Sequence, residues 1–307
     1  MNFLGVDIGG TKIATGVVDS NGKVLAALTI PTPSREGGAA VLQAAVDISR
    51  QLLESVSVSV NSIGVGTGGQ VNSSTGVVLT ATDLLPGWAG QRISDRFTNE
   101  FGLPAFVEND VNALAVGELR CAGAPAKGTV VFLAIGTGLG GALLVDGKIY
   151  HGTHWSGGEI GQMIIDIRED ARTDGAGNRG TFEAFVSGHG LVTTWGEITG
   201  DNSTIDGYEI ARDAQVDSGG PGALAISKTG HYLGLGLVSV VSLIDPQLIV
   251  IGGGMAALGE MLLDPARKTL AERAHGNAKS CPIVSSSLGS QSSIIGAAAV
   301  AMVKAHE

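Results

Sequence analysis

Short runs of apolar and β-branched residues alternate along the chain with longer segments of helical periodicity. This alternation is typical of a mixed α/β protein with partly parallel sheets. Near the amino terminus, tight turns join three consecutive predicted strands, and helices and further strands follow. The predicted strands are Phe3–Asp7, Ile13–Asp19, Lys23–Ile30, Ser62–Gly66 and Ala105–Val107, and the predicted helices are Glu36–Ser55, Gln91–Phe101 and Val111–Arg120.

A Gly/Pro/Ala-rich connection at Cys121–Gly128 is a candidate domain boundary. The longest uncharged stretch, Gly128–Val145, is long enough to span a membrane, but its five glycines and central turn favour a strand, a turn and a strand. The polar segment Ile198–Gly222 predicts helices and loops without firm bounds. The other predictions here are strands at Thr129–Ile135, Gly140–Asp146 and Leu248–Ile251 and helices at Ala223–Ile244 and Ser293–Ala305.

An internal echo links the two parts of the chain. Ile8 is followed eleven residues later by Asp19 and then by a Gly-Lys pair. Ile135 is followed eleven residues later by Asp146 and again by a Gly-Lys pair. Either β-hairpins simply resemble one another, or the chain has two related domains that each contribute a hairpin turn to a shared cleft.

Charge and cysteine content exclude several classes of protein. The formal net charge of -10 argues against a surface that binds nucleic acid or an anionic membrane. Cys121 and Cys281 are the only cysteines, so we expect no disulfide framework and no cysteine-based zinc site. The amino terminus lacks a basic region before an apolar run, which predicts no secretory signal and a cytoplasmic protein.

Glycine is in large excess, with 48 of 307 residues, about twice the usual share. Two glycine-rich turns lie at corresponding places in the echo, DIGGTK at residues 7–12 and GTGLGG at residues 136–141. Successive N–H groups in such a turn can hold a phosphate, and the carboxylate of Asp7 can hold Mg²⁺ or its water shell. Each turn alone could be an ordinary hairpin, but the pair suggests a triphosphate held from two sides.

A third glycine run lies near the carboxyl terminus. Gly252–Gly254 connects the predicted strand Leu248–Ile251 to a predicted helix at Met255–Leu258, and a nucleotide can lie against backbone in such a place. The run also satisfies the dinucleotide fingerprint literally, which keeps a nicotinamide-dependent dehydrogenase as an alternative. Its place outside a first βαβ unit disfavours that alternative.

Carboxylates accompany the remaining motifs. Asp110, in END at residues 108–110, is either an ordinary residue near a helix N-cap or a base toward a hydroxyl. GGEIGQ at residues 157–162 and GNRGTFE at residues 177–183 place Glu159 and Glu183 on glycine-rich loops. There they either accept hydrogen bonds from a polyhydroxylated ligand or lie solvated on the surface.

In this order, the motifs DIGGTK, END, GTGLGG, GGEIGQ, GNRGTFE and IVIGGG resemble the ROK family of sugar kinases and sugar-responsive repressors, from residue 3 to about residue 300. The resemblance implies an α/β, actin-like ATPase fold with two ribonuclease H-like lobes around a central cleft. Residues 1–120 would form a small N-terminal lobe together with the C-terminal helix 293–307, and residues 121–292 a large C-terminal lobe. Because the chain begins at the first strand of this fold, we expect no DNA-binding domain of the repressor type.

The resemblance also implies roles for individual residues. Asp110 would take the proton from a sugar 6-hydroxyl, and Asn109 would bind neighbouring hydroxyls. The other residues expected to bind the sugar are Gly69, Gln70, Thr82, Glu159, Gln162 and Glu183. Those expected to bind ATP and Mg²⁺ are Asp7, Gly9, Gly10, Thr11, Lys12, Gly136, Thr137, Gly138, Gly253 and Gly254.

The chain departs from the family pattern at the zinc motif. The family commonly carries GE-x-GH followed by CxCGxxGCxE, in which one histidine and three cysteines bind a structural zinc. Here those positions hold Gln162, Asp174, Ala176 and Thr181. These side chains cannot form a tetrahedral site of nitrogen and sulfur, so we predict no zinc. Gln162 also replaces a histidine that touches the sugar in the family, which leaves the substrate preference open.

The implied activity is that of an ATP:hexose 6-phosphotransferase that uses ATP and Mg²⁺. Glucose is the family default. Residues 67–71 and 81–84 are similar to the segment that lines the 2-substituent pocket of N-acetylmannosamine kinases, so N-acetylmannosamine and N-acetylglucosamine remain alternatives. A sugar sensor without catalysis is a further alternative. We expect a homodimer with no nucleic-acid or membrane partner, and no basic run favours polyphosphate over ATP as donor.

Overall fold

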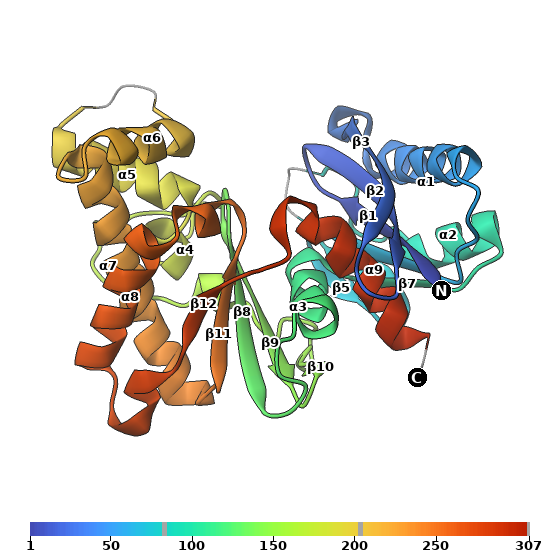
Figure 1. The fold of residues 1–307 in the computed structure, drawn as a ribbon. Coiled ribbons are helices and arrows are strands. Elements are labelled where there is room, and N and C mark those ends of the chain that lie inside the picture. Colours follow the sequence, from blue (N-terminus) through green and yellow to red (C-terminus); the bar gives the residue numbers. More distant parts are fainter. Residues whose placement is uncertain (82–84, 202–204, 306–307) are drawn as a thin grey trace. The chain divides into compact units, whose positions relative to one another are not determined.

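The computed structural model describes residues 1–81, 85–201 and 205–305 (Figure 1). The chain divides into two compact units, which are described separately. Unit 1 comprises Met1–Ala126, His151–Gly157 and Ser287–Glu307, and unit 2 comprises Lys127–Tyr150 and Gly158–Ser286. The predicted boundary after residue 120 would divide the last turn of α3 (Asp110–Cys121). The predicted C-terminal lobe also included His151–Gly157, which belong to unit 1.

Unit 1 is built on a five-stranded sheet with the order β3-β2-β1-β4-β7. The central strand β1 pairs antiparallel with β2 and parallel with β4, and β4 pairs parallel with β7. A short hairpin of β5 (Gln70–Asn72) and β6 (Val77–Thr80) follows β4. The strands of the main sheet are β1 (Asn2–Ile8), β2 (Lys12–Asp19), β3 (Val24–Pro31), β4 (Ile63–Thr67) and β7 (Ala105–Asn109).

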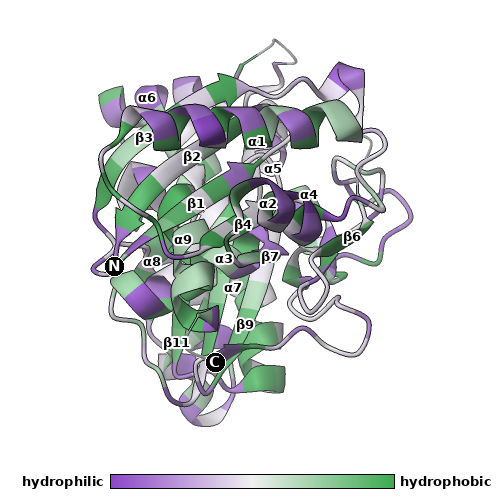
Figure 2. Ribbon diagram, turned by 90° about the vertical axis from the view of Figure 1, so that its right-hand side faces the viewer, coloured by the Kyte–Doolittle hydropathy of each residue, from purple (hydrophilic) through white to green (hydrophobic). Residues whose placement is uncertain are grey.

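Helices cover both faces of this sheet. Neighbouring residues of a strand point to opposite sides, so each face has its own buried cluster. Leu4 belongs to a buried cluster beneath α1 (Gly38–Ser55) and α2 (Ile93–Phe101). Its neighbour Phe3 belongs to a second cluster with α9 (Ser292–Lys304), which also packs against α3. Figure 2 shows hydrophilic and hydrophobic bands on α1, as expected of a helix with one buried face, whereas α9 is mainly hydrophobic.

Unit 2 repeats this plan with a sheet of the order β10-β9-β8-β11-β12. Its central strand β8 pairs antiparallel with β9 and parallel with β11, and β11 pairs parallel with β12. Order and direction match unit 1 strand for strand, which supports two related domains as the origin of the sequence echo. The strands are β8 (Thr129–Ile135), β9 (Leu139–Val145), β10 (Lys148–Ile149), β11 (Leu248–Gly252) and β12 (Ile283–Ser285).

The long helix α7 is the centre of the helical layer of unit 2, where it packs against α5, α6 and α8. Among the described residues it is the one helix long and apolar enough to cross a membrane, but 56% of its most apolar window is buried inside the unit. Its apolar character therefore has a packing explanation. The helices are α4 (Phe182–Phe185), α5 (Gly188–Thr199), α6 (Gly207–Val216), α7 (Pro221–Ile244) and α8 (Glu260–Arg273).

The strands and helices predicted with bounds begin and end within two residues of the observed ones. The helix predicted at Met255–Leu258 is a 3₁₀ helix at Gly254–Leu258, and an interruption separates it from α8, which begins only at Glu260. The interruption arises at Gly259, whose φ of 55° ends the 3₁₀ helix. The pattern missed β5, β6, β10, β12, α4, α5 and α8.

Candidate functional site

The junction between β7 and α3 holds the first candidate residues, Asn109 and Asp110. The side-chain oxygen of Asn109 caps α3 by accepting hydrogen bonds from the N–H groups of Val111 (3.0 Å) and Asn112 (3.1 Å). Its amide nitrogen donates to the carbonyl of Gly69 (3.1 Å) and to Asp110 Oδ1 (3.0 Å). Both amide hydrogens and the oxygen of Asn109 are thus engaged within unit 1, and a sugar hydroxyl would have to displace one of these bonds.

Asp110 presents its two carboxylate oxygens differently. Oδ1 accepts hydrogen bonds from the Val111 N–H (2.8 Å) and from Asn109, whereas Oδ2 faces Gly68, where an added Cβ would lie 3.9 Å away. Burial raises the pKa of Asp110, and the hydrogen bonds from Val111 and Asn109 oppose that rise. One oxygen is therefore anchored, and the other lies over a residue without a side chain.

Asp7, near the end of β1, is the second candidate carboxylate of unit 1. Burial raises its pKa to about 6; a hydrogen bond with Ser293 lowers it, the charge of Asp110 raises it, and Lys12 lowers it. Ser293 belongs to α9, and no signal in the sequence pointed to this helix start as a partner of β1. The charge of Asp110 thus adds to the effect of burial on the pKa of Asp7, and a divalent cation beside Asp7 would relieve that repulsion.

We expect the substitution Asp7→Asn to stabilise the protein in magnesium-free buffer. Because the carboxyl of Asp7 ionises less readily in the folded chain, the wild type loses stability as the pH rises from about 4 to about 6. Removing the ionisable group should raise the free energy of unfolding by about 2 kcal/mol at pH 8 and by little at pH 4. Urea unfolding of both proteins at the two pH values measures this, and an equally stable or weaker variant at pH 8 contradicts it.

The β1–β2 turn contains the predicted phosphate-binding residues Gly9, Gly10 and Thr11, and Lys12 follows as the first residue of β2. Thr32 holds two of its carbonyl oxygens, since its N–H donates to Thr11 (3.0 Å) and its hydroxyl to Gly9 (2.6 Å). No described residue accepts a hydrogen bond from the N–H of Gly10 or Thr11. These two N–H groups can therefore donate to a ligand, which suits a phosphate.

The β8–β9 turn of unit 2 contains Gly136, Thr137 and Gly138. Gly136 donates to the carbonyl of Gly138 (2.9 Å), while no described residue accepts from the N–H of Thr137 or Gly138. Glu183 reaches this turn from α4: its Oε2 accepts from the Leu139 N–H (2.7 Å) and would lie 2.5 Å from a Cβ at Gly138. Glu183, expected to bind sugar, is thus in direct contact with the turn expected to bind phosphate.

The glycines at two other predicted sites have structural reasons of their own. Gly253 has a φ of 81°, and a Cβ there would overlap the carbonyl of Ile135, whereas Gly254 has open space around it. Gly69 has a φ of 94°, and a Cβ there would overlap the carbonyl of Thr80. The backbone conformations of Gly253 and Gly69 therefore require glycine without any ligand, whereas that of Gly254 does not.

The remaining predicted sugar-binding residues lie in different surroundings. Gln70 donates a hydrogen bond to the hydroxyl of Ser156 (2.9 Å), within unit 1. Glu159 and Gln162, in unit 2, are both exposed. Thr82 lies outside the described residues.

An interaction that the sequence did not reveal lies beside Asp110. His151 Nε2 contacts Glu108 Oε2 (2.7 Å) and Ser73 Oγ (3.1 Å), while Glu108 Oε1 accepts from the Asn109 N–H (2.9 Å) and from Asn112 (3.0 Å). Because one ring nitrogen makes both contacts, this is not the relay of a Ser-His-acid triad, which uses both nitrogens. The buried Glu108 instead ties His151 to the β7–α3 junction.

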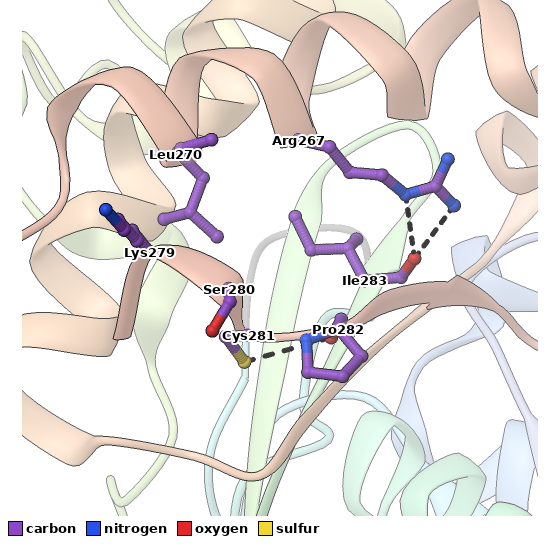
Figure 3. A pocket seen from close by; sticks show the side chains of 8 residues that line it. Arg267, Leu270, Lys279, Ser280, Cys281, Pro282 and Ile283 are labelled. Atoms are coloured by element: carbon purple, nitrogen blue, oxygen red, sulfur yellow. Dashed lines mark hydrogen bonds between the residues drawn. The ribbon is translucent and has the colours of Figure 1, made fainter. Parts of the chain in front are cut away.

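A hollow of about 360 Å³ lies in unit 2 (Figure 3), and no predicted site residue lines it. Arg267 on its wall donates to the carbonyl of Ile283 and pairs with Glu260 and Asp264, so its guanidinium is occupied. Burial raises the pKa of Cys281 to about 11, which disfavours a reactive thiolate. Among the described residues, no three His, Cys, Asp or Glu side chains form a group that could hold a metal ion by themselves.

Comparison with known proteins gives consistent matches over nearly the whole chain. The model of the ROK family matches residues 3–304. A glucokinase of Streptomyces coelicolor is 31% identical, over 97% of this chain and 96% of that protein. An N-acetyl-D-glucosamine kinase of Yersinia enterocolitica is also 31% identical, over 83% of this chain and 84% of that protein.

The solved structures agree with the sequence matches. The crystal structure of a ROK family glucokinase from Streptomyces griseus, in complex with glucose and AMPPNP, has a TM-score of 0.82 and 29% identity, and covers 97% of this chain and 98% of that one. The predicted actin-like ATPase fold is thereby confirmed. The family resemblance indicated by the order of the six motifs is confirmed, and the chain belongs to the ROK family.

Proposed function

We propose that the protein is an ATP-dependent sugar kinase that transfers the γ-phosphate of ATP to the 6-hydroxyl of a hexose. The observation that carries this proposal is the state of Asp110, a carboxylate with a raised pKa, one oxygen anchored and the other over Gly68. A base that works near neutral pH needs such a raised pKa and one oxygen available to the reacting hydroxyl.

In the proposed reaction, Asp110 Oδ2 accepts the proton of the sugar 6-hydroxyl while the new O–P bond forms and the bond between the γ-phosphorus and the ADP oxygen breaks. Asn109 and the Val111 N–H hold the other oxygen, so the carboxylate keeps its orientation. The N–H groups of Gly10 and Thr11, and separately those of Thr137 and Gly138, are proposed donors to phosphate oxygens.

Mg²⁺ would supply positive charge that neutralises the transferred phosphoryl group. Asp7 is the proposed holder of this ion or of its water shell, because the repulsion from Asp110 already raises its pKa. Lys12, at the start of β2, lowers that pKa and is the proposed cation beside the same phosphates.

For the substrate we propose glucose, which the names of the glucokinase relatives support. N-acetylglucosamine is the second candidate, supported by the N-acetyl-D-glucosamine kinase relative at equal identity. Gly69, Gln70, Glu159, Gln162 and Glu183 are proposed to bind sugar hydroxyls, and Gly253 and Gly254 to lie near the adenosine. A homodimer and a cytoplasmic location remain predictions.

A coupled assay of ADP release, run with glucose, mannose, fructose, N-acetylglucosamine and N-acetylmannosamine, tests the proposal. We expect the kcat/KM for glucose to exceed that for either N-acetylhexosamine by about tenfold or more. A reaction without sugar is the control for ATP hydrolysis. A reversed order assigns the chain to the N-acetylhexosamine kinases, and sugar binding without ADP formation assigns it to the non-catalytic sensors.

A further inference from the structure

A hydrogen-bonded centre in unit 2 surrounds the carboxylate of Asp174. Its Oδ1 accepts from the N–H groups of Ala176 (3.0 Å) and Asn178 (2.8 Å). Its Oδ2 accepts from the hydroxyl of Thr181 (3.1 Å) and from the side-chain amide of Asn178 (3.3 Å). That same amide also donates to Gln162 Oε1 (3.3 Å), so one network joins Gln162, Asp174, Asn178 and Thr181.

Three members of this network occupy positions where the family pattern has zinc ligands: Gln162, Asp174 and Thr181. The residues present do not fit zinc. Ala176 has no ligand atom, Thr181 offers only a neutral hydroxyl, and both oxygens of Asp174 already accept hydrogen bonds. The arrangement is that of a hydrogen-bonded carboxylate.

The network leads directly to Glu183. Thr181 is the N-cap of α4, where its hydroxyl accepts from the Ala184 N–H (3.3 Å) while donating to Asp174. Glu183 lies in the first turn of α4 and holds the Leu139 N–H at the β8–β9 turn. A change at Asp174 therefore reaches Glu183 through one cap residue and one short helix.

We propose that Asp174 is a positioning residue that does with hydrogen bonds what the zinc motif does in the family pattern: it orders the loop between Gln162 and Thr181 and so sets the place of Gln162 and Glu183. This inference rests on the proposed function for its effect on sugar binding, but its structural part stands on the network alone.

The electrostatics of Asp174 agree with this role. The side chain is only 8% exposed, and burial by itself would raise its pKa, yet the hydrogen bonds from Asn178, Thr181 and Ala176 outweigh burial and lower it. The carboxylate is therefore charged at neutral pH and satisfied from several sides. Replacing it with an amide leaves at least one of its donors without an acceptor.

The test uses Asp174→Asn and Thr181→Val in the full-length protein, with Thr181→Ser as the variant that keeps the hydroxyl. The matched control is Asp206→Asn, which weakens another capping carboxylate of unit 2, at the start of α6. For each protein, kcat and KM for glucose, the sugar affinity by calorimetry, and hydrogen exchange at the Ala176 and Asn178 amides are measured.

We expect Asp174→Asn and Thr181→Val each to raise the KM and the sugar Kd about tenfold with kcat within about threefold, and their double variant to add little. Amide exchange at Ala176 and Asn178 should quicken by about tenfold or more in Asp174→Asn. Thr181→Ser and Asp206→Asn should bind sugar as the wild type does.

Unchanged exchange and unchanged sugar affinity in Asp174→Asn would overturn the inference, as would stoichiometric zinc in the purified wild type. If Asp174→Asn does not fold, the sugar affinities of Thr181→Val and Thr181→Ser are compared instead, and equal affinities would overturn the inference. A wild type that binds sugar but forms no ADP would refute the proposed kinase function alone, because exchange and affinity report on the network without any catalysis.

Discussion

Asp110→Asn should reduce the rate of phosphoryl transfer by about 100-fold or more without unfolding the protein. An amide cannot accept the proton of the 6-hydroxyl, and general base catalysis by a positioned side chain contributes about 10²–10⁴-fold. The fold should persist, since the Asn109 side chain still caps α3 through the N–H groups of Val111 and Asn112. Loss of a buried carboxylate with a raised pKa also removes a source of instability at neutral pH.

The measurement combines the ADP-release assay with calorimetric binding of the sugar. We expect Asp110→Asn to bind sugar with a Kd within about tenfold of the wild type, so that the loss lies in kcat. Asp95→Asn, an exposed carboxylate of α2 that pairs with Arg92, is the matched control in unit 1 and should keep full activity. A variant that retains more than about a tenth of the wild-type rate would remove Asp110 from the role of base.

The second large effect concerns stability: Gly64→Ala should lower the free energy of unfolding by about 3 kcal/mol or more. Gly64 lies in β4 beneath α9, and a Cβ there would overlap the backbone carbonyl of Ala297. No flexible side chain can move aside at this contact, so α9 would have to lift from the sheet. That displacement would also disturb Ser293, the hydrogen-bond partner of Asp7.

Gly66→Ala is the control, because it lies on the same strand and its Cβ would meet the Ala113 side chain at an ordinary 3.4 Å. Urea unfolding of the two variants and the wild type measures the difference. We expect Gly66→Ala to remain within about 1 kcal/mol of the wild type. Equal stability of the two variants would show that α9 does not require glycine at position 64.

Local sequence signals were sufficient for the strands around both glycine turns. The runs Ile13–Asp19 and Thr129–Ile135 mark β2 and β8, because a strand that is buried on both faces is apolar or β-branched over most of its length. They were insufficient for β5, β6 and β12, which have three or four residues each and are too short to carry a period. They also did not predict α8, which the positive φ of Gly259 separates from the 3₁₀ helix Gly254–Leu258.

In the candidate site, too, the sequence indicated some features and only the folded chain shows the others. The motif order identified the family and drew attention to Asp7, Asp110 and Glu183. It could not show that the Asn109 side chain is occupied as a helix cap, or that Glu183 lies against Gly138. Those facts depend on which atoms lie within hydrogen-bond distance, and residues far apart in sequence decide that.

By itself, the amino-acid sequence determined the positions of the longer strands and of most helices, the family, and the places where backbone without a side chain recurs, because periodicity and glycine runs are local properties. Only the tertiary structure decided the partners: Ser293 of the last helix beside Asp7 of the first strand, His151 on Glu108, and the hydrogen bonds that surround Asp174 where cysteines are missing. The physical reason is that burial and hydrogen bonding set the charge state and orientation of a carboxylate, and chain folding alone brings together the groups that do so.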